Sequence, residues 1–326
     1  MHARAEVSHV LVADWLMPDF DYEREAFQRA GVTWSLPEAG HPPPPRDRQH
    51  ARLLERIAQA PRIDAVLFQL APLDAEAIQA LPESCRLLQR MGIGLDTVDL
   101  QEAARRGIAV RNTPDYCLEE VSVHAMAMLL GLHRQLGATQ QRLLAGGWVD
   151  RSPEPIRRLS TLVLGVIGWG RIGRRLAEQM RPLVAKVLCH DPQVTELPPW
   201  AQGVSLEELL AESDLVSLHC PLVPDTRGLI NARTLGLMKP AAVLVNTARG
   251  GLVDPEALAA ALNEGRLAGA GLDVYEPEVL PEDSPLRTCK NTILTSHTAW
   301  YSEESIPDAR AAAVRNILEA LAGEIA

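Results

Sequence analysis

Short runs of β-branched and other apolar residues alternate with helix-period patterns along most of this chain. Strand runs followed by helices in this way are typical of parallel α/β sheets, in which a helix connects each strand to the next. The first third of the chain predicts strands over 7–13, 65–69, 86–90 and 108–111 and helices over 22–30, 46–59 and 96–106.

A long helical pattern follows over 118–145 and is closed by two glycines. Its apolar residues, which include Met126 and Met128, cover most of the circumference of the helix. A helix that is apolar on most sides is buried on several sides. We therefore expect this segment to pack in a core or between two subunits, and it favours a homodimer.

A strand-helix-strand unit comes next, with a strand-like run over 162–167, a helical pattern over 171–181 and a second strand over 184–190. Asp191 directly follows that second strand, eighteen positions after the last glycine of the turn between the first strand and the helix. An acid at this place can accept hydrogen bonds from the ribose hydroxyls of an adenosine. Because its carboxylate would repel a 2′-phosphate, NAD is favoured over NADP.

The turn itself reads Gly168-x-Gly170-x-x-Gly173. Three glycines at this spacing are a weak signal alone, but a strand before and a helix after are the context of a dinucleotide-binding turn. Gly168 permits the tight turn, Gly170 lets the backbone approach a pyrophosphate, and Gly173 allows close packing of helix on strand. We expect the main-chain amides of Arg171 and Ile172 to face the phosphates at the helix N-terminus.

Four later strands carry polar residues at their carboxyl ends, over 215–221, 243–251, 270–278 and 292–300. Ligands bind to open parallel sheets at the carboxyl ends of the strands. These four strands therefore predict a site to which they contribute an arginine, two acids and a histidine.

The composition narrows the function. The chain has 326 residues, which favours two domains, and its 32 Lys and Arg against 42 Asp and Glu give a formal net charge of −10. No basic excess or stripe is visible, so a nucleic-acid or anionic membrane partner is disfavoured. The five cysteines lie far apart without metal-ligand spacing, which predicts no disulfide framework and no metal site. Without a signal peptide or membrane-spanning run, the protein is expected to be cytoplasmic.

Six blocks occur in order along the chain: 91–96 (MGIGLD), 112–117 (NTPDYC), the glycine turn, 246–250 (NTARG), 272–275 (LDVY) and His297. Together they resemble the D-isomer-specific 2-hydroxyacid dehydrogenase family over nearly the whole length. The segment 297–303 (HTAWYSE) resembles the branch of that family containing the C-terminal-binding proteins, corepressors that kept a dehydrogenase fold.

The resemblance implies a catalytic set of Arg249, Glu278 and His297. Arg249 would grip the carboxylate of a 2-oxo acid and polarise the neighbouring carbonyl, which suits the planar guanidinium. His297 would donate a proton to the carbonyl oxygen while hydride arrives from the nicotinamide. Glu278 would orient the imidazole and stabilise its charged form.

The choice of Glu278 rests on family spacing, five positions after the Asp of the LDVY block, and Glu276 stays open as the partner of the histidine. The family often has proline directly after this glutamate, where Val279 stands here. Ser296 and Met91 also depart from the residues common in the family, and both are expected to tune substrate choice.

Further contacts are implied on both sides of the reacting centre. The expected cofactor contacts beyond the glycine turn, Asp191 and the catalytic Arg and His are His219, Pro221, Thr247, Ala248 and Asp273, the last near the nicotinamide. The expected substrate contacts beyond the catalytic residues are main-chain groups of Ile93 and Gly94, with Trp300 either a pocket wall or an ordinary packed aromatic.

We therefore predict an α/β protein in which a doubly wound parallel-sheet NAD domain, residues 109–299, is inserted into a smaller flavodoxin-like α/β substrate domain, residues 1–108 and 300–326. The expected activity is NAD-dependent interconversion of a small 2-oxo acid and its D-2-hydroxy acid in a homodimer. An NAD-sensing scaffold of the corepressor type is the alternative, which the complete Arg, Glu and His set and the lack of a long disordered tail disfavour. Phosphoglycerate dehydrogenase is a third possibility, weakened because no room for a regulatory domain follows the predicted C-terminal helix.

Overall fold

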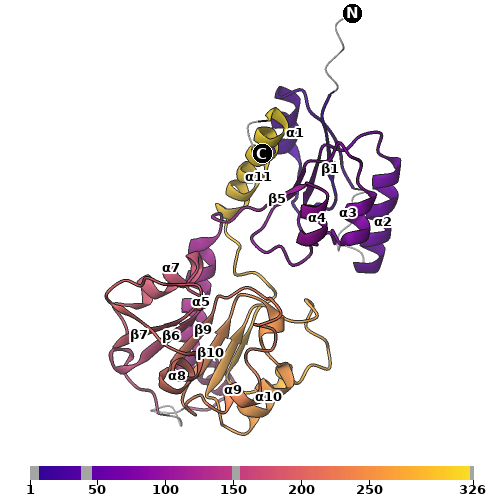
Figure 1. Ribbon diagram of the computed structural model, residues 1–326. Helices are drawn as coiled ribbons and strands as arrows, with labels where there is room; N and C mark the ends of the chain where they lie inside the picture. Colours follow the sequence, from indigo (N-terminus) through magenta and orange to yellow (C-terminus); the bar gives the residue numbers. More distant parts are fainter. Residues whose placement is uncertain (1–6, 38–45, 149–154, 324–326) are drawn as a thin grey trace, which may run out of the picture. The chain divides into compact units, whose positions relative to one another are not determined.

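The computed structural model describes residues 7–37, 46–148 and 155–323 (Figure 1). The chain divides into two compact units. The first comprises Met1–Tyr116 and Ser302–Ala326, and the second comprises Cys117–Tyr301. The second unit is thus inserted into the first along the sequence.

The first unit contains a five-stranded parallel sheet in the order β2-β1-β3-β4-β5, the flavodoxin-like order. Alternate residues of each strand face opposite sides, and the core has two halves accordingly. Figure 1 shows α1 and α11 on one side and α2, α3 and α4 on the other. The elements are β1 His9–Val12, α1 Asp21–Arg29, β2 Thr33–Ser35, α2 Arg46–Gln59, β3 Ala65–Phe68, α3 Ala75–Ala80, β4 Leu87–Arg90, α4 Leu100–Arg105, β5 Ala109–Arg111 and α11 Ser305–Ala322.

The division between the units differs from the predicted boundary of 108/109. The short strand β5 pairs in parallel with β4, so it completes the sheet of the first unit. The chain enters the second unit only at Cys117. On the return, the first unit resumes at Ser302, two residues after the predicted start at 300, and α11 begins at Ser305. The pairing of β5 with β4 depends on residues distant in the sequence, so the local pattern at 109–111 does not predict it.

The C-terminal helix α11 is fastened to the first unit through Arg310. Its guanidinium forms two hydrogen bonds to the buried carboxylate of Glu23, at 2.8 and 2.6 Å, and one to Asp19 at 2.8 Å. It also lies over the rings of Trp15 and Tyr22, each 5.9 Å from the ring centroid. The far end of the chain therefore contributes to the core begun by its first residues.

The second unit holds a seven-stranded parallel sheet in the order β12-β11-β10-β9-β6-β7-β8. The order reverses at β6, as in doubly wound dinucleotide-binding folds, so the predicted fold class is confirmed. Helices α5 and α7 cover one face, and α8, α9 and α10 cover the other. The elements are α5 Leu118–His133, α6 Leu136–Leu144, β6 Val163–Ile167, α7 Arg171–Met180, β7 Lys186–His190, β8 Ala201–Gly203, α8 Leu206–Glu212, β9 Leu215–Leu218, α9 Ala232–Leu235, β10 Val243–Asn246, α10 Pro255–Asn263, β11 Gly269–Leu272 and β12 Thr292–Leu294, with short 3₁₀ turns at Leu159–Thr161, Gly250–Leu252 and Pro285–Thr288.

The long helix predicted over 118–145 is in fact two helices. Gln135 adopts a left-handed conformation, with φ of 54°, and separates α5 from α6. A residue at positive φ cannot continue a right-handed helix, although the apolar pattern runs on across it. Helix α5 packs against β10 and β11, while α6 buries none of its residues within the unit.

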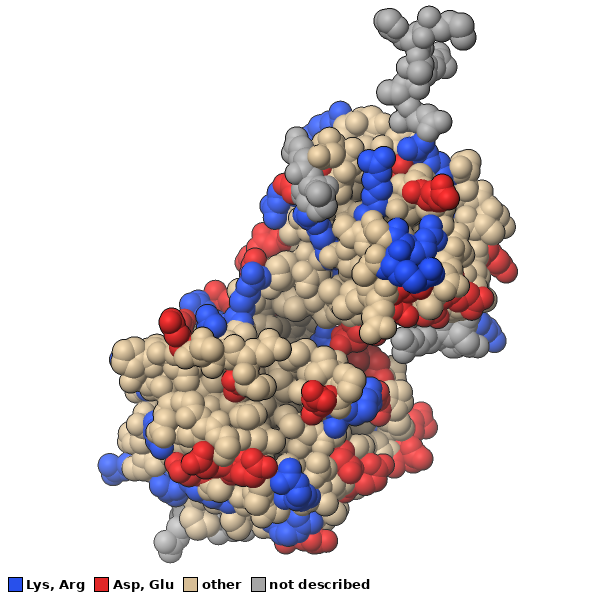
Figure 2. Space-filling model, viewed as in Figure 1, with Lys and Arg blue, Asp and Glu red and all other residues tan. Residues whose placement is uncertain are grey.

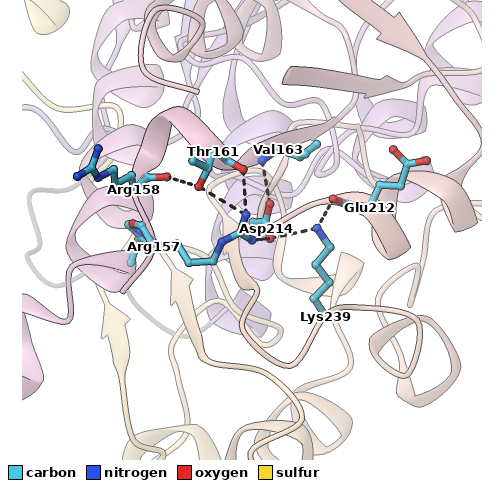
Figure 3. Close-up of polar contacts among 8 residues, drawn as sticks. Arg157, Arg158, Thr161, Val163, Glu212, Asp214 and Lys239 are labelled. Atoms are coloured by element: carbon cyan, nitrogen blue, oxygen red, sulfur yellow. Dashed lines mark hydrogen bonds and ion pairs between the residues drawn. The ribbon is translucent and has the colours of Figure 1, made fainter. Parts of the chain in front are cut away.

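A buried acid ties the amino-terminal edge of this sheet together (Figure 3). The carboxylate of Asp214 accepts hydrogen bonds from the Val163 amide, Arg157 and Lys239 at 2.9, 3.1 and 3.0 Å. The Lys239 ammonium also donates to the Glu212 carbonyl at 2.6 Å. Asp214 thus connects β6 and β9 at the edge opposite the strand ends that carry the predicted site.

Candidate functional site

The glycine turn after β6 requires glycine for reasons visible in its contacts. Gly168 has φ of 95°, and a Cβ there would lie 2.5 Å from the Cys220 amide nitrogen. A Cβ on Gly173 would lie 2.2 Å from the Gly168 carbonyl oxygen. Gly170 has ordinary φ of −70°, and its Cβ would meet no described atom within 4 Å. Gly168 and Gly173 therefore allow close packing, while Gly170 leaves the backbone open in front of α7.

The N-terminus of α7 lies directly behind that opening. Its first intrahelical bond runs from the Arg174 amide to the Gly170 carbonyl, at 3.0 Å. The amides of Arg171, Ile172 and Gly173 precede this bond, and together with the helix dipole they form the end of a helix suited to an anion. This geometry fits a dinucleotide pyrophosphate.

Asp191 follows β7 and lies against the same turn. One carboxylate oxygen accepts the Trp169 amide at 2.7 Å, and the other accepts the Gln193 amide at 2.9 Å. An ionised carboxylate has about four acceptor positions, so two remain for ribose hydroxyls. Trp169, which the sequence reading did not single out, is 2% exposed and packs against Trp200, with ring centroids 6.0 Å apart. This packing fixes the amide that holds Asp191.

The next strand end places His219 beside the glycine turn. Its amide donates to the Ile167 carbonyl at 2.7 Å, and its Nε2 lies 2.9 Å from the Ser217 hydroxyl. Burial lowers the pKa of His219 to about 4, so the imidazole is neutral near pH 7. The Pro221 carbonyl accepts the Thr226 hydroxyl at 2.6 Å, which fixes the loop that follows β9.

Thr247 and Ala248 follow β10 at the same edge. The Ala248 amide donates to the Asn246 side chain at 3.0 Å. Thr247 is 8% exposed, and within the described ranges its hydroxyl oxygen has no hydrogen-bond partner. A buried hydroxyl without a partner is costly, so this side chain fits a site completed by a polar ligand. The residues at this edge therefore fit NAD.

His297 and Glu278 contact each other through Nδ1 of the imidazole and Oε1 of the carboxylate. Glu276, the alternative partner, instead forms an ion pair with Arg227 at 2.6 Å. The contact at Nδ1 leaves Nε2 as the ring nitrogen for another partner. The geometry thus selects Glu278 as the acid beside the histidine.

The backbone of His297 is held in an unusual conformation, with φ of 54°. Its amide donates to the Asp273 carbonyl at 2.7 Å. The fully buried Asp273 carboxylate accepts three more bonds, from the Thr295 hydroxyl at 2.5 Å, the Thr298 amide at 2.9 Å and the Ala299 amide at 3.0 Å. Left-handed backbone costs a non-glycine residue on the order of 1 kcal/mol, and these four bonds hold it in place. The predicted contact of Asp273 with the nicotinamide stays a prediction.

Arg249 lies at the same edge of the sheet as His297. Asn246, Leu272 and Leu294 are paired across β10, β11 and β12, and Arg249 and His297 each follow three residues beyond. A Cβ on the adjacent Gly250 would lie 2.0 Å from the Tyr275 carbonyl carbon, so the loops after β10 and β11 are in close contact. The Asn246 side chain donates to the Arg249 carbonyl at 2.8 Å and fixes the backbone of that arginine.

Sequence reasoning missed two residues of this edge. The Tyr275 hydroxyl lies 2.9 Å from both the Leu272 and Thr295 carbonyl oxygens, and desolvation raises the pKa of Tyr275 to about 12. The second is His124 of α5, whose Nε2 lies 3.1 Å from the Thr295 hydroxyl. The contacts of Tyr275 and His124 with Thr295 span 20 and 171 positions in the sequence, so no local signal could have found them.

The contacts of the remaining predicted substrate residues do not test their predicted roles. Trp300 packs edge-on against Tyr301 with ring centroids 5.8 Å apart, and its role as a pocket wall stays a prediction. Ile93 and Gly94 belong to the first unit, where the Asn112 side chain donates to the Ile93 carbonyl at 2.6 Å.

Comparison with known proteins identifies the family. The family model described as D-isomer specific 2-hydroxyacid dehydrogenase, NAD binding domain, matches residues 126–299. The chain belongs to this family. Its second unit is therefore the NAD-binding domain of a D-isomer specific 2-hydroxyacid dehydrogenase family member, and the predicted cofactor is confirmed as NAD at the level of the family.

Individual relatives agree with this. D-3-phosphoglycerate dehydrogenase of Mycobacterium tuberculosis is 37% identical over 272 residues, which cover 82% of this chain and 51% of the relative. This chain thus spans about half the length of the curated relatives it matches. A glyoxylate reductase structure from Paecilomyes thermophila is 30% identical, with a TM-score of 0.85 and coverage of 97% of this chain and 95% of that one. D-lactate dehydrogenase from Aquifex aeolicus, complexed with NAD and lactic acid, is 29% identical, with a TM-score of 0.82 and coverage of 97% and 96%.

The described residues contain neither a metal-binding cluster nor a membrane-spanning helix. Within the ranges 7–37, 46–148 and 155–323, no three His, Cys, Asp or Glu side chains are grouped to hold a metal ion. No helix in the same ranges combines the length and hydrophobicity that crossing a bilayer needs. On the face shown in Figure 2, basic and acidic side chains are interspersed over the surface.

Proposed function

We propose that this family member is an NAD-dependent oxidoreductase that interconverts a small 2-oxo acid and its D-2-hydroxy acid. The observation that carries the proposal is the contact of His297 with Glu278 at the sheet edge that also bears Arg249. An acid-base pair and a cation at one edge match what carbonyl reduction requires.

Each side chain has a part in this reaction. The guanidinium of Arg249 binds the substrate carboxylate and polarises the adjacent carbonyl through planar, charge-assisted hydrogen bonds. His297 gives the proton on Nε2 to the carbonyl oxygen, and Glu278 at Nδ1 orients the ring and stabilises its positive charge. When bound, NADH supplies the hydride. In the oxidative direction His297 takes the hydroxyl proton back.

The cofactor preference follows from Asp191. Its carboxylate lies at the glycine turn, where the two main-chain amides of Trp169 and Gln193 hold it. A 2′-phosphate brought next to a fixed carboxylate is repelled, so we propose that NADH is used in preference to NADPH. The substrate contacts of Ile93, Gly94 and Trp300 remain part of this proposal.

A second copy of the chain is the proposed partner. Helix α6 buries none of its residues in its own unit, and Leu136, Leu143 and Leu144 are 62%, 56% and 77% exposed. Trp148, just beyond the helix, is 83% exposed. Clustered exposed apolar side chains of this kind mark protein–protein contacts, which supports the homodimer expected from the sequence.

Two alternatives are separated by one substrate panel. The relatedness to D-3-phosphoglycerate dehydrogenase favours phosphohydroxypyruvate as a substrate, whereas a corepressor-type scaffold would bind NADH with little turnover. NADH oxidation is measured with glyoxylate, hydroxypyruvate, pyruvate, 4-methylthio-2-oxobutyrate and phosphohydroxypyruvate. Turnover with one of the unphosphorylated acids supports the proposal, and a preference for the phosphorylated one selects the first alternative. Tight NADH binding without turnover on any substrate would select the scaffold.

A further inference from the structure

His124 occupies a place in the NAD-binding domain that ordinary packing does not explain. It lies on α5, and its side chain is 26% exposed. Its Nε2 lies 3.1 Å from the Thr295 hydroxyl oxygen and 3.9 Å from Oδ1 of Asp273. The contact joins residues 171 positions apart and reaches the turn that carries His297.

The proton in each hydrogen bond between His124, Thr295 and Asp273 can be assigned by counting donors. The Thr295 hydroxyl has a single proton, and its oxygen is 2.5 Å from Oδ1 of Asp273. A carboxylate only accepts hydrogen bonds, so the Thr295 proton points to Asp273. Thr295 therefore meets His124 as an acceptor, and Nε2 of His124 must carry a proton whether the ring is neutral or charged.

This series of hydrogen bonds ends at the backbone of His297. Asp273 holds the 297–299 segment through its carbonyl and both carboxylate oxygens. The orientation of that carboxylate depends on the Thr295 hydroxyl, and the orientation of the hydroxyl depends on the donor at His124. A histidine at φ of 54° needs such support, because its conformation is unfavourable on its own.

We propose that His124 is a positioning residue for the proton donor His297, and that it acts by donating from Nε2 to Thr295 and thereby fixing Asp273. The role of His297 as proton donor rests on the proposed function, but the direction of the hydrogen bonds does not. The inference adds to the reacting groups a residue of α5 that acts through Thr295 and Asp273. It therefore acts on the geometry of the proton transfer.

The first test reads the protons directly in the wild-type chain. Long-range ¹H–¹⁵N NMR of the histidine rings at pH 7.5, assigned by difference with His124→Gln, reports which ring nitrogen is protonated. We expect Nε2 of His124 to be protonated, and the signals of His297 to shift in His124→Asn but to stay in place in His124→Gln. A neutral His124 protonated only at Nδ1 would overturn the proposal. This readout requires no turnover, so it stands even if the proposed function fails.

The second test uses variants that differ only in reach. The amide of glutamine can replace the Nε2 donor of histidine, whereas the shorter asparagine cannot reach Thr295. We expect His124→Asn to lower kcat about tenfold with the KM for NADH within about twofold of the wild type, and His124→Gln to retain most of kcat. His133→Asn, on the same helix but bonded to the Arg157 carbonyl at 2.9 Å, is the matched control and should leave kcat unchanged. Equal losses in the Asn and Gln variants of His124 would contradict the proposal.

Discussion

The imidazole of His297 contacts the carboxylate of Glu278, whereas Glu276, two residues earlier, is paired with Arg227. Two glutamates separated by a single proline thus have separate partners. The chain itself therefore provides a matched pair of substitutions for the acid-base assignment.

Glu278→Gln is expected to lower kcat on the order of a hundredfold, because the neutral amide no longer stabilises the charged imidazole of His297. Glu276→Gln breaks only the half-exposed ion pair with Arg227, so its kcat should stay within about twofold of the wild type. Steady-state kinetics on the best substrate of the panel compares the two. A larger loss in the Glu276 variant would show that the wrong glutamate has been assigned.

Substitutions at two glycines of the turn are expected to affect stability and cofactor binding separately. Gly168→Ala places a Cβ 2.5 Å from the Cys220 nitrogen at a φ of 95°, so we expect it to lower the free energy of unfolding by about 2 kcal/mol or more. Gly170→Ala has room within the protein but obstructs the approach of a pyrophosphate to α7. Its stability should match the wild type while its Kd for NADH rises at least about tenfold. Thermal melting and fluorescence titration measure the two quantities, and an unaltered Kd in Gly170→Ala would refute this placement of the phosphates.

The buried His219 makes stability depend on pH. Its pKa is about 4 in the folded chain, below the ordinary value of 6.5, so the unfolded chain binds the extra proton between these values. The contribution of neutral His219 is complete above pH 6.5 and is lost as the pH falls toward 4, by about 3 kcal/mol in total. Urea unfolding of the wild type and His219→Gln at pH 7.5 and pH 5 should show a smaller decrease in the variant. The same decrease in both proteins would mean that His219 is not the group responsible.

Asp214 should be important for stability and irrelevant to chemistry. Asp214→Ala leaves the Val163 amide, Lys239 and Arg157 without their shared acceptor, and we expect a loss of about 2–4 kcal/mol in the free energy of unfolding. The exposed neighbour Glu212 pairs with Lys186 at 3.1 Å, and Glu212→Gln should cost less than about 1 kcal/mol. Urea unfolding compares them. A small effect of Asp214→Ala would show that the contacts in Figure 3 contribute little.

Much of the fold and part of the site could be predicted because their signals are local. The strand over 163–167, the glycine turn and the helix from Arg171 lie within one short stretch, where Gly168 adopts the positive φ of the turn and Gly173 lies against the Gly168 carbonyl. The parallel α/β class follows from the alternation of strands and helices. The contact of His297 with Glu278 agrees with the family spacing, although the catalytic roles of Arg249, Glu278 and His297 are still proposals.

The features that escaped prediction depend on partners distant in sequence. The hydrophobic pattern of 118–145 continues through Gln135, so only the backbone angle reveals the break between α5 and α6. Strand β5 is too short for its sequence to predict which sheet it joins. The hydrogen bonds by which Asp273 holds the histidine turn come from residues 22 to 26 positions later in the sequence, and its expected contact with the cofactor stays a prediction.

The central claim, that Arg249 and His297 act on the substrate while the glycine turn holds NADH, is tested most directly by measuring both activities in the same variants. Arg249→Ala and His297→Asn are titrated with NADH by fluorescence and then assayed for NADH oxidation with the best 2-oxo acid. We expect the Kd for NADH to stay within about threefold of the wild type and kcat/KM to fall by a factor on the order of a thousand or more. Turnover at the wild-type rate in both variants would contradict the assignment.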